Sequence, residues 1–305
     1  MYSTLFNMYY PSCTSQIMDF LAGASRAGAL KTMFEGDLSP VAVRGGAELQ
    51  DITTMLCNLV DEYEPVWRQT INIHPNIAYV IGGLCDLTEK RKHRDWRGLY
   101  EEVIVDFDFR HALDYIDSEY RYSEHRIKQK GVIPVFSTIT TMDILNWNMH
   151  RNTKPVQPWL RRKTDYLLFQ ADYPRMQSNL NNIIIHANEI IRNINRQNNV
   201  MTLDLARHVM IPREGTVPGE EVKYKIRTGK ALLHDGCHPA PSLKREWVFH
   251  MSATKTINRL QLSSPEAIKI TDDASRNICD LAGIPLHKSS FRYKLADFYP
   301  HSRRY

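Results

Sequence analysis

Short apolar runs alternate with longer segments of helical periodicity through most of the chain. The runs of strand length are residues 16–22, 40–44, 76–81, 132–139 and 200–205. The segments that favour helix are residues 24–33, 49–67, 176–197 and 241–260. Apolar residues three and four positions apart indicate amphipathic helices, and short buried runs between them indicate parallel strands. The pattern predicts an α/β fold, a three-layer α/β/α sandwich with a mostly parallel sheet of about five strands.

The segments that interrupt this alternation define the expected domain organisation. Residues 1–260 are expected to form one domain, a size that a single α/β domain with additions can reach. Charged residues indicate a helical insertion at residues 89–130, and a segment rich in Asn, Pro, Arg and Trp indicates a loop excursion at residues 146–175. Residues 261–305 are a polar C-terminal extension. Because Pro134 lacks an N–H group, the fourth strand is expected to begin near it or to lie at a sheet edge.

Composition and charge restrict the possible functions only slightly. The chain of 305 residues has 43% hydrophobic and 24% charged residues, as globular proteins commonly do. Its formal net charge of +5 is mildly basic. Basic residues gather near residues 90–97 and 151–163, and the simplest interpretation is a set of solvated loops and helix faces. Contact with nucleic acid stays open as a minor alternative, since a dedicated binder concentrates Lys and Arg on one face.

Five cysteines without CxxC spacing argue against a disulfide framework or a zinc ribbon. A reducing compartment is the simpler expectation. No stretch approaches 18 uninterrupted apolar residues, so no membrane span is expected. The first ten residues lack Lys and Arg, and Pro11 ends their apolar run, so no signal peptide is evident. These features predict a cytoplasmic or nuclear protein.

Three features follow predicted strands or precede a predicted helix. Ser25 follows the first strand, Gly82-Gly83 follows the third, and Asp235 precedes His238 by three residues before the last helix. A serine hydroxyl needs a neighbouring base, and a histidine base needs an orienting acid. Taken singly, Ser25 could be an N-cap, Asp235 a turn residue and His238 a surface residue. Their order and their placement at the ends of βα units favour a Ser-His-Asp site.

In this order, the motifs resemble those of the SGNH/GDSL hydrolase superfamily over roughly residues 15–260. The matching blocks are Gly23-Ala24-Ser25-Arg26-Ala27-Gly28, Gly46-Ala47, Gly83-Leu84-Cys85-Asp86 and Asp235-Gly236-Cys237-His238-Pro239. The resemblance implies the SGNH-hydrolase or flavodoxin-like form of the predicted sandwich. It also implies that Ser25, Asp235 and His238 are catalytic, and that Ser25, Gly46 and Cys85 form the oxyanion hole. A narrower similarity extends to SGNH-like domains of invertebrate mobile elements and viruses.

Two positions depart from the family pattern. Ala24 replaces the Asp of the first block, which is not the triad acid. Cys85 replaces the Asn whose amide donates to the oxyanion, and a thiol is a weak hydrogen-bond donor. Losing one such donor costs about 100- to 1000-fold in turnover. Cys85 and Cys237 are expected near the same pocket, as small space-filling residues or as a redox-sensitive pair.

Two functions remain open from the sequence. The first is an ester or acyl-ester hydrolase that uses neither cofactor nor metal, with a small ester, an acylated glycan or a lipid as substrate. The second is a catalytically impaired SGNH-like binding domain of a viral or mobile-element protein. A metal site formed by the side chains of residues 234–238 is not expected, because neighbours on a short turn seldom converge on one tetrahedral ion. The sequence leaves the oligomeric state open.

Overall fold

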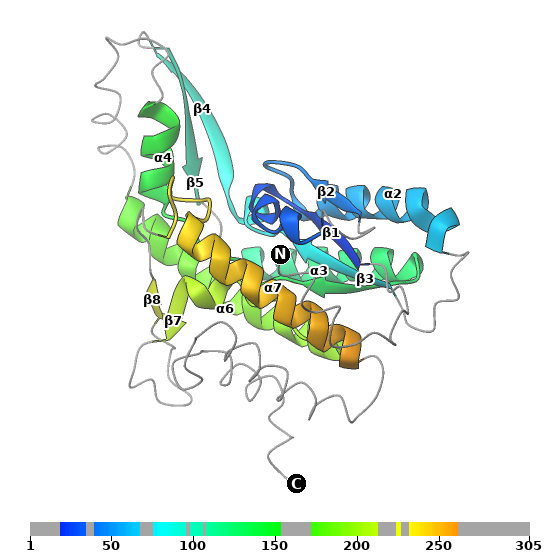
Figure 1. Cartoon of the computed structure of the whole chain (residues 1–305). Helices are drawn as coiled ribbons and strands as arrows, with labels where there is room; N and C mark the ends of the chain where they lie inside the picture. The colour runs from blue at the N-terminus through cyan, green and yellow to red at the C-terminus, as the bar shows by residue number, and fades with distance from the viewer. Residues whose placement is uncertain are drawn as a thin grey trace.

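The protein is built around a parallel four-stranded sheet flanked by helices (Figure 1). A computed structural model describes residues 19–34, 40–67, 76–95, 98–105, 108–153, 172–212, 224–226 and 232–261. The strands of the sheet are β1 (Asp19–Gly23), β2 (Val41–Val43), β3 (Asn76–Ile81) and β6 (Val132–Phe136), in the order β2-β1-β3-β6. All three pairings are parallel. The predicted α/β class is confirmed, with fewer strands in the sheet than expected.

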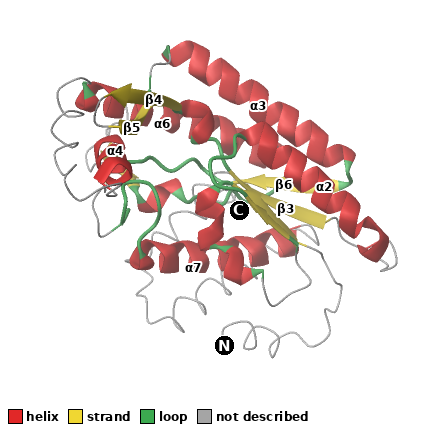
Figure 2. Ribbon diagram, turned by 90° about the horizontal axis from the view of Figure 1, so that it is seen from above, coloured by secondary structure: helices red, strands yellow, loops and turns green. Residues whose placement is uncertain are grey.

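Helices cover both faces of the sheet, which makes the predicted three layers. α2 (Leu49–Trp67) packs on β1 and β2, and α3 (Phe109–Gln129) packs on α2 and β6. α6 (Tyr173–Gln197) lies against α3, while α7 (Pro241–Gln261) lies on the opposite face (Figure 2). β1 and β3 are buried along their whole length, as strands between two helical layers must be. This arrangement brings the carboxyl ends of β1, β2 and β3 together at one edge.

The expectation of a fifth strand at residues 200–205 is wrong. This segment meets β6 only through an isolated parallel bridge between Ser137 and Leu203. The side-chain amide of Asn195 in α6 instead bonds both backbone groups of Phe136, at 3.0 Å for its N–H and 2.8 Å for its C=O. Since Ser137 donates its N–H to β3, the neighbouring Phe136 groups face the side where a fifth strand would pair. The side chain of Asn195 therefore forms the hydrogen bonds to β6 that a fifth strand would form.

Three further asparagines hold extended backbone in the same way. Each donates to one backbone C=O and accepts from the N–H of the same residue, and we call the four together the asparagine clamps. The pairs are Asn148 with Val103, Asn188 with Ile139, Asn195 with Phe136 and Asn258 with Met201. All four asparagines are buried. Their amides satisfy buried backbone groups that lack a strand partner, which removes a desolvation penalty of about 1–3 kcal/mol for each group.

The segment 89–130, expected to be mostly helical, begins as a β-hairpin. β4 (Glu89–Asp95) and β5 (Gly98–Ile104) pair antiparallel, and α3 follows them. In this register Arg91 lies opposite Glu102 and Lys92 lies opposite Glu101. Cross-strand pairs of opposite charge stabilise a hairpin. Because the paired residues are not neighbours in the sequence, local composition does not reveal such pairs. The hairpin projects beyond the sheet beside α4 (Ile144–Thr153) (Figure 1).

The loop excursion expected at residues 146–175 is helical at both of its described ends. α4 occupies its start, and α6 begins at Tyr173, three residues before the expected helix start. Asp172 caps α6 by accepting the N–H of Arg175, and Pro174 suits the first turn, where no N–H is needed. Residues 154–171 and the extension after residue 261 lie outside the described residues. Pro134 lies within β6, the outer strand of the four, in agreement with the expected edge position.

The described chain also contains short irregular elements. The 3-10 helices are η1 (Ser25–Ala29), η2 (Lys31–Met33), η3 (Cys85–Leu87) and η5 (Ala206–His208). A small antiparallel pair joins β7 (Met210–Pro212) to β8 (Tyr224–Ile226). In the described residues no helix is long and apolar enough to span a membrane.

Candidate active site

Ser25 lies directly after β1, where the chain turns away from the sheet. The N–H of Ala24 donates to Ile81 O at 2.9 Å, so the turn is fixed against the end of β3. The helix expected at residues 24–33 forms only as the two 3-10 helices η1 and η2. One reason is that Arg26 turns inward and is buried, which a regular helix on the protein surface would not require. Since η1 has only five residues, it supplies little helix-dipole support for an anion beside Ser25.

Asp235 and His238 lie on a tight turn before α7. An antiparallel bridge between Leu233 and Pro239 closes the turn. Gly236 has φ +87°, and a side chain there would come within 2.6 Å of the backbone nitrogen of Trp147. Glycine is required at this position both for the left-handed backbone and for the close approach of α4. The close contact with α4 thus fixes the turn, in addition to the hydrogen bonds within the turn.

A continuous hydrogen-bond path joins the three predicted triad residues. His238 Nδ1 lies 2.6 Å from Asp235 Oδ2, and His238 Nε2 lies 2.9 Å from Ser25 Oγ. Since an ionised carboxylate only accepts, the Nδ1 proton donates to Asp235 and Nε2 is left to accept from the Ser25 hydroxyl. Asp235 is 7% exposed, whereas the His238 side chain is 28% exposed. The nucleophile and base geometry matches what serine catalysis needs.

The carboxylate of Asp235 is held in its charged form. Burial alone raises its pKa, but hydrogen bonds from the His238 backbone and side chain and from the Cys237 backbone outweigh burial. The net result is a pKa of about 2. The two backbone N–H groups donate to Oδ1, at 2.9 Å from Cys237 and 2.7 Å from His238. One oxygen therefore fixes the turn while the other orients the imidazole.

Arg26 connects the serine turn to two other loops, a role that sequence reasoning missed. Its guanidinium donates to the backbone oxygens of Cys237 and Thr141, each at 3.0 Å, and to both oxygens of Thr140. It also lies 3.5 Å from the sulfur of Cys237. Arg26 is only 7% exposed, so these bonds form away from water. Because it directly follows Ser25, it couples Ser25 to the turn that carries His238.

The two other predicted oxyanion residues, Gly46 and Cys85, line one cavity of about 420 Å³ beside this site. Gly45 approaches Ser25, whose Cβ lies 3.9 Å from the position that a Cβ on Gly45 would take. Burial raises the pKa of the Cys85 thiol, so a neutral thiol faces the cavity. The structure thus brings Ser25, Asp235 and His238 into direct contact, and it places Gly46 and Cys85 together at the cavity.

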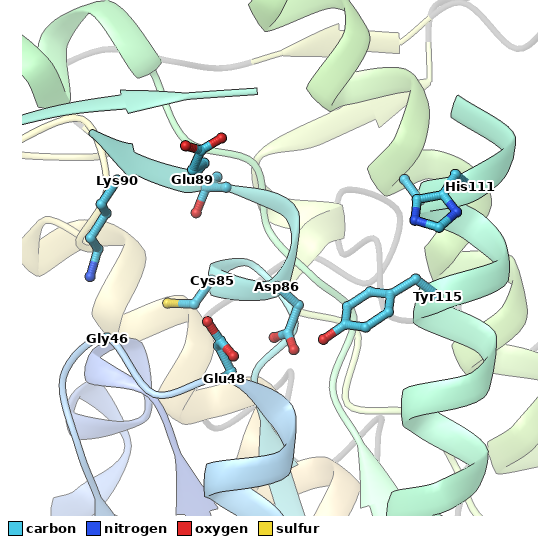
Figure 3. A pocket seen from close by; sticks show the side chains of 10 residues that line it. Gly46, Glu48, Cys85, Asp86, Glu89, Lys90, His111 and Tyr115 are labelled. Carbon is cyan, nitrogen blue, oxygen red and sulfur yellow. The ribbon is translucent and has the colours of Figure 1, made fainter. Parts of the chain in front are cut away.

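Most of the side chains that line the cavity carry polar groups (Figure 3). The lining includes Glu48, Asp86, Glu89, Lys90, His111 and Tyr115. Asp86 accepts the N–H of Leu49 with both oxygens, at 3.0 and 3.2 Å, and so caps the first turn of α2. Burial is the largest influence on this carboxyl and raises its pKa to about 6. His111 and Lys90 are exposed but lie at this cavity, and Lys90 belongs to the basic run that the sequence assigns to solvated surface.

Aromatic and metal-binding side chains complete the surroundings of His238. The ring of Trp147 lies 5.5 Å from the His238 ring, centroid to centroid, and shields one side of it. His234, Asp235 and His238 place potential ligand atoms within 4.8 Å of one another. Both ring nitrogens of His238 already bond Asp235 and Ser25, so the cluster fits a triad better than a metal centre.

Comparisons with known proteins found similarity at the level of solved structures. No family model and no curated protein matches the chain. A GDSL-like lipase from Bacteroides thetaiotaomicron is 10% identical with a TM-score of 0.42, over 83% of this chain and 94% of the lipase. A protein designated an acylhydrolase from Bacteroides fragilis is 11% identical with a TM-score of 0.44, over 84% and 95%. One designated an SGNH hydrolase from Slackia heliotrinireducens is 12% identical with a TM-score of 0.39, over 79% and 100%.

Proposed function

We propose that the protein is a serine esterase that hydrolyses small carboxylic esters with Ser25, His238 and Asp235. The observation that carries the proposal is the unbroken hydrogen-bond path from Asp235 through His238 to the Ser25 hydroxyl. Residues 235 and 25 are far apart in sequence and belong to separate turns. An isolated N-cap serine or a surface histidine would not need this alignment.

The reaction would proceed through an acyl-enzyme. Ser25 Oγ forms a bond to the ester carbonyl carbon while its proton moves to His238 Nε2. The tetrahedral intermediate collapses, and the leaving alcohol takes the proton from Nε2. Water then attacks the acyl group, gives a proton to Nε2 and releases the acid, and Ser25 Oγ regains its proton. Asp235 holds the imidazole in the required tautomer and stabilises its positive charge.

We further propose that the N–H groups of Ser25 and Gly46 bind the carbonyl oxygen as it becomes negative. Backbone donors aimed at a developing charge commonly supply the largest part of the barrier reduction in acyl transfer. Cys85 occupies the third position of this site and contributes little as a donor. The proposed enzyme is therefore slower than one with a side-chain amide there, unless another group donates.

The nature of the substrate follows from the cavity beside the proposed oxyanion site. Its carboxylates, imidazole and phenol offer hydrogen bonds to hydroxyl groups, and a long acyl chain would desolvate the charged groups among them. We propose a short acyl ester of a polar alcohol, with an acylated glycan favoured over a lipid.

Labelling with a fluorophosphonate probe tests the proposal, because the probe reacts with an activated serine. Covalent labelling of the full chain is expected, and Ser25→Ala should abolish it. Ser118→Ala, which changes an exposed serine on α3, is the matched control and should label normally. If the folded wild-type chain is not labelled at any pH between about 6 and 9, Ser25 is not activated by a base near the histidine range. The catalytically impaired binding domain would then replace the esterase as the better hypothesis.

A further inference from the structure

The space above Gly46 contains a cation that the triad does not use. Gly46 has φ +73°, and a Cβ on this residue would lie 2.9 Å from the Nζ atom of Lys90. Glycine therefore leaves the room that the ammonium occupies. Figure 3 shows the Lys90 side chain extending from β4 toward Gly46, with the sulfur of Cys85 directed to the same space. The Lys90 charge also lowers the pKa of the Cys85 thiol, against the larger effect of burial, which places the two groups within electrostatic reach.

The hairpin fixes the backbone from which Lys90 extends. Lys90 pairs with Val103 in the β4–β5 ladder, and the backbone of Val103 is in turn held by the buried amide of Asn148. The preceding turn is closed by Thr88, whose hydroxyl donates to Leu84 O at 3.1 Å. The ammonium thus extends from an anchored strand rather than from a free loop.

Lys90 keeps its charge available. Its neighbour Arg91 pairs with Glu89 at 3.1 Å, but within the described part of the chain the Lys90 ammonium makes no hydrogen bond or ion pair. A solvated ammonium at the mouth of a cavity attracts a negative charge that develops beside it. When substrate displaces water from the cavity, the interaction strengthens because the local dielectric constant falls.

We infer that the Lys90 ammonium is a catalytic oxyanion donor that replaces the amide missing at Cys85. The inference rests on the proposed esterase function and names a further group in the same site. As Ser25 Oγ bonds to the carbonyl carbon, the carbonyl electron pair moves onto oxygen, and Lys90 donates an N–H to that oxygen beside Gly46. A charge-assisted hydrogen bond of this kind is about twice as strong as a neutral one, whereas a thiol offers almost none.

The test measures fluorophosphonate labelling rates and p-nitrophenyl acetate hydrolysis in the full chain. Lys90→Met should lower kcat and the labelling rate by about 10- to 100-fold with little change in KM, as expected for a donor used only in the transition state. Lys92→Met is the matched control, since Lys92 lies two residues along the same strand, and it should behave as wild type. Adding Cys85→Asn to Lys90→Met should restore most of the lost rate.

Three outcomes would overturn the inference while leaving the proposed function intact. In each of them the wild-type chain is labelled at Ser25. Lys90→Met could equal Lys92→Met in rate, or it could raise KM alone, which would make Lys90 a substrate-binding group. The third outcome is that Cys85→Asn accelerates wild type and Lys90→Met by the same factor. An unlabelled wild-type chain instead refutes the esterase proposal itself, and the role of Lys90 with it.

Discussion

At the scale of single residues, Asp235 and Asp86 show how environment separates two carboxyl groups. Asp235 receives two backbone N–H groups and the imidazole, and its pKa falls to about 2. Asp86 is also buried and accepts from the N–H of Leu49, but burial is the largest influence on it and the nearby Glu48 and Glu119 add to it, so its pKa rises to about 6. The balance between burial and like charges on one side and hydrogen-bond donors on the other decides the direction of each pKa shift. Asp235 is therefore fully ionised wherever the protein is expected to work, and Asp86 titrates close to neutrality.

Replacing the triad acid should separate orientation from folding. We expect Asp235→Asn to lower kcat by about 10³- to 10⁴-fold, because the amide cannot hold the imidazole in the tautomer that accepts from Ser25. The Asn oxygen can still accept the N–H groups of residues 237 and 238, so the melting temperature should fall by only a few degrees, about 2–8 °C. Hydrolysis of p-nitrophenyl acetate and a thermal melt measure the two effects. Activity within threefold of wild type would contradict the role given to Asp235.

Asp86 predicts a pH dependence of stability. Its pKa in the folded state lies above the ordinary value, so the folded chain holds a proton between about pH 4 and 6 that the unfolded chain has released. The contribution of Asp86 therefore grows as pH falls through about 6 and is lost above it, with an upper limit of about 3 kcal/mol. Asp86→Asn removes this dependence. Relative to wild type, its free energy of unfolding should be higher at pH 7 than at pH 4.5.

Urea denaturation at the two pH values measures this difference. Asp114→Asn, at an exposed position on α3, is the control and should show the same offset from wild type at both. If Asp86→Asn also shows a constant offset, burial does not raise the pKa of Asp86.

At this scale the sequence predicts which residues meet but not what holds them. Ser25, Asp235 and His238 each follow a strand or precede a helix, so chain order alone predicts their meeting. Arg26 looks like any charged residue near a turn, and only its burial among three loops reveals its role. Lys90 belongs to a run of basic residues, and from composition alone such a run is expected to lie on the solvated surface. Contacts made by a long side chain across the fold leave no local signal in the sequence.

At the scale of elements, the proposed active site is a junction of loops rather than part of the sheet. Arg26 bonds the loop after β6 through Thr140 and Thr141 and the turn before α7 through Cys237. The residue immediately before it is Ser25. Movement of any of these loops would therefore shift the serine and the histidine relative to each other.

Removing this junction should weaken both stability and reactivity. Arg26→Met leaves three buried carbonyl groups without their donor, and we expect a loss of about 2–5 kcal/mol in the free energy of unfolding. The fluorophosphonate labelling rate should fall as well, since the serine turn loses its tie to His238. Arg121→Met is the control, because Arg121 forms only an exposed pair with Asp117 on α3, a kind of pair worth about 0.3–0.5 kcal/mol. Equal urea midpoints for the two variants would show that Arg26 does not stabilise the junction.

The sequence predicts the elements correctly where apolar residues recur at regular spacing over a long, unbroken segment. The ranges expected for α2 and β3 coincide with those observed, and α7 differs by one residue. The hairpin of β4 and β5 was missed because its strands are charged and show no apolar alternation. The fifth strand is predicted from its apolar residues but does not form. Residues 200–205 have the apolar character of a strand, but Asn195 and Asn258 take the backbone groups that such a strand would use.

At the scale of the whole molecule, the β4–β5 hairpin adds charged side chains at the carboxyl edge of an otherwise apolar sheet. Glu89 and Lys90 come from β4, Glu48 precedes α2, and His111 belongs to α3. The polar cavity thus depends on the insertion between β3 and β6 and not on the sheet alone. Substrate choice is therefore expected to depend on the insertion, while the proposed chemistry depends on the loops that carry Ser25 and His238.

The charged side chains that line the cavity predict a preference among esters. We expect acetyl esters to be hydrolysed at least about tenfold faster, by kcat/KM, than palmitoyl esters, because burying a carboxylate against a long chain without a partner is costly. An acetylated oligosaccharide should compete with p-nitrophenyl acetate. The measurement is kcat/KM for p-nitrophenyl esters of increasing chain length, with detergent held constant. A rate that rises with chain length would contradict a polar substrate.

The asparagine clamps also affect how the sheet meets other chains. The open side of an outer strand is a template on which a second molecule can add a strand, and this is a common origin of aggregation. On β6, Asn195 occupies the outward N–H and C=O of Phe136, and Pro134 has no N–H to offer. A side-chain amide ends the hydrogen-bond ladder, because no further strand can be built upon it. The clamp thus protects the sheet edge against intermolecular growth, a task that β-proteins more often give to an added strand or to edge charges.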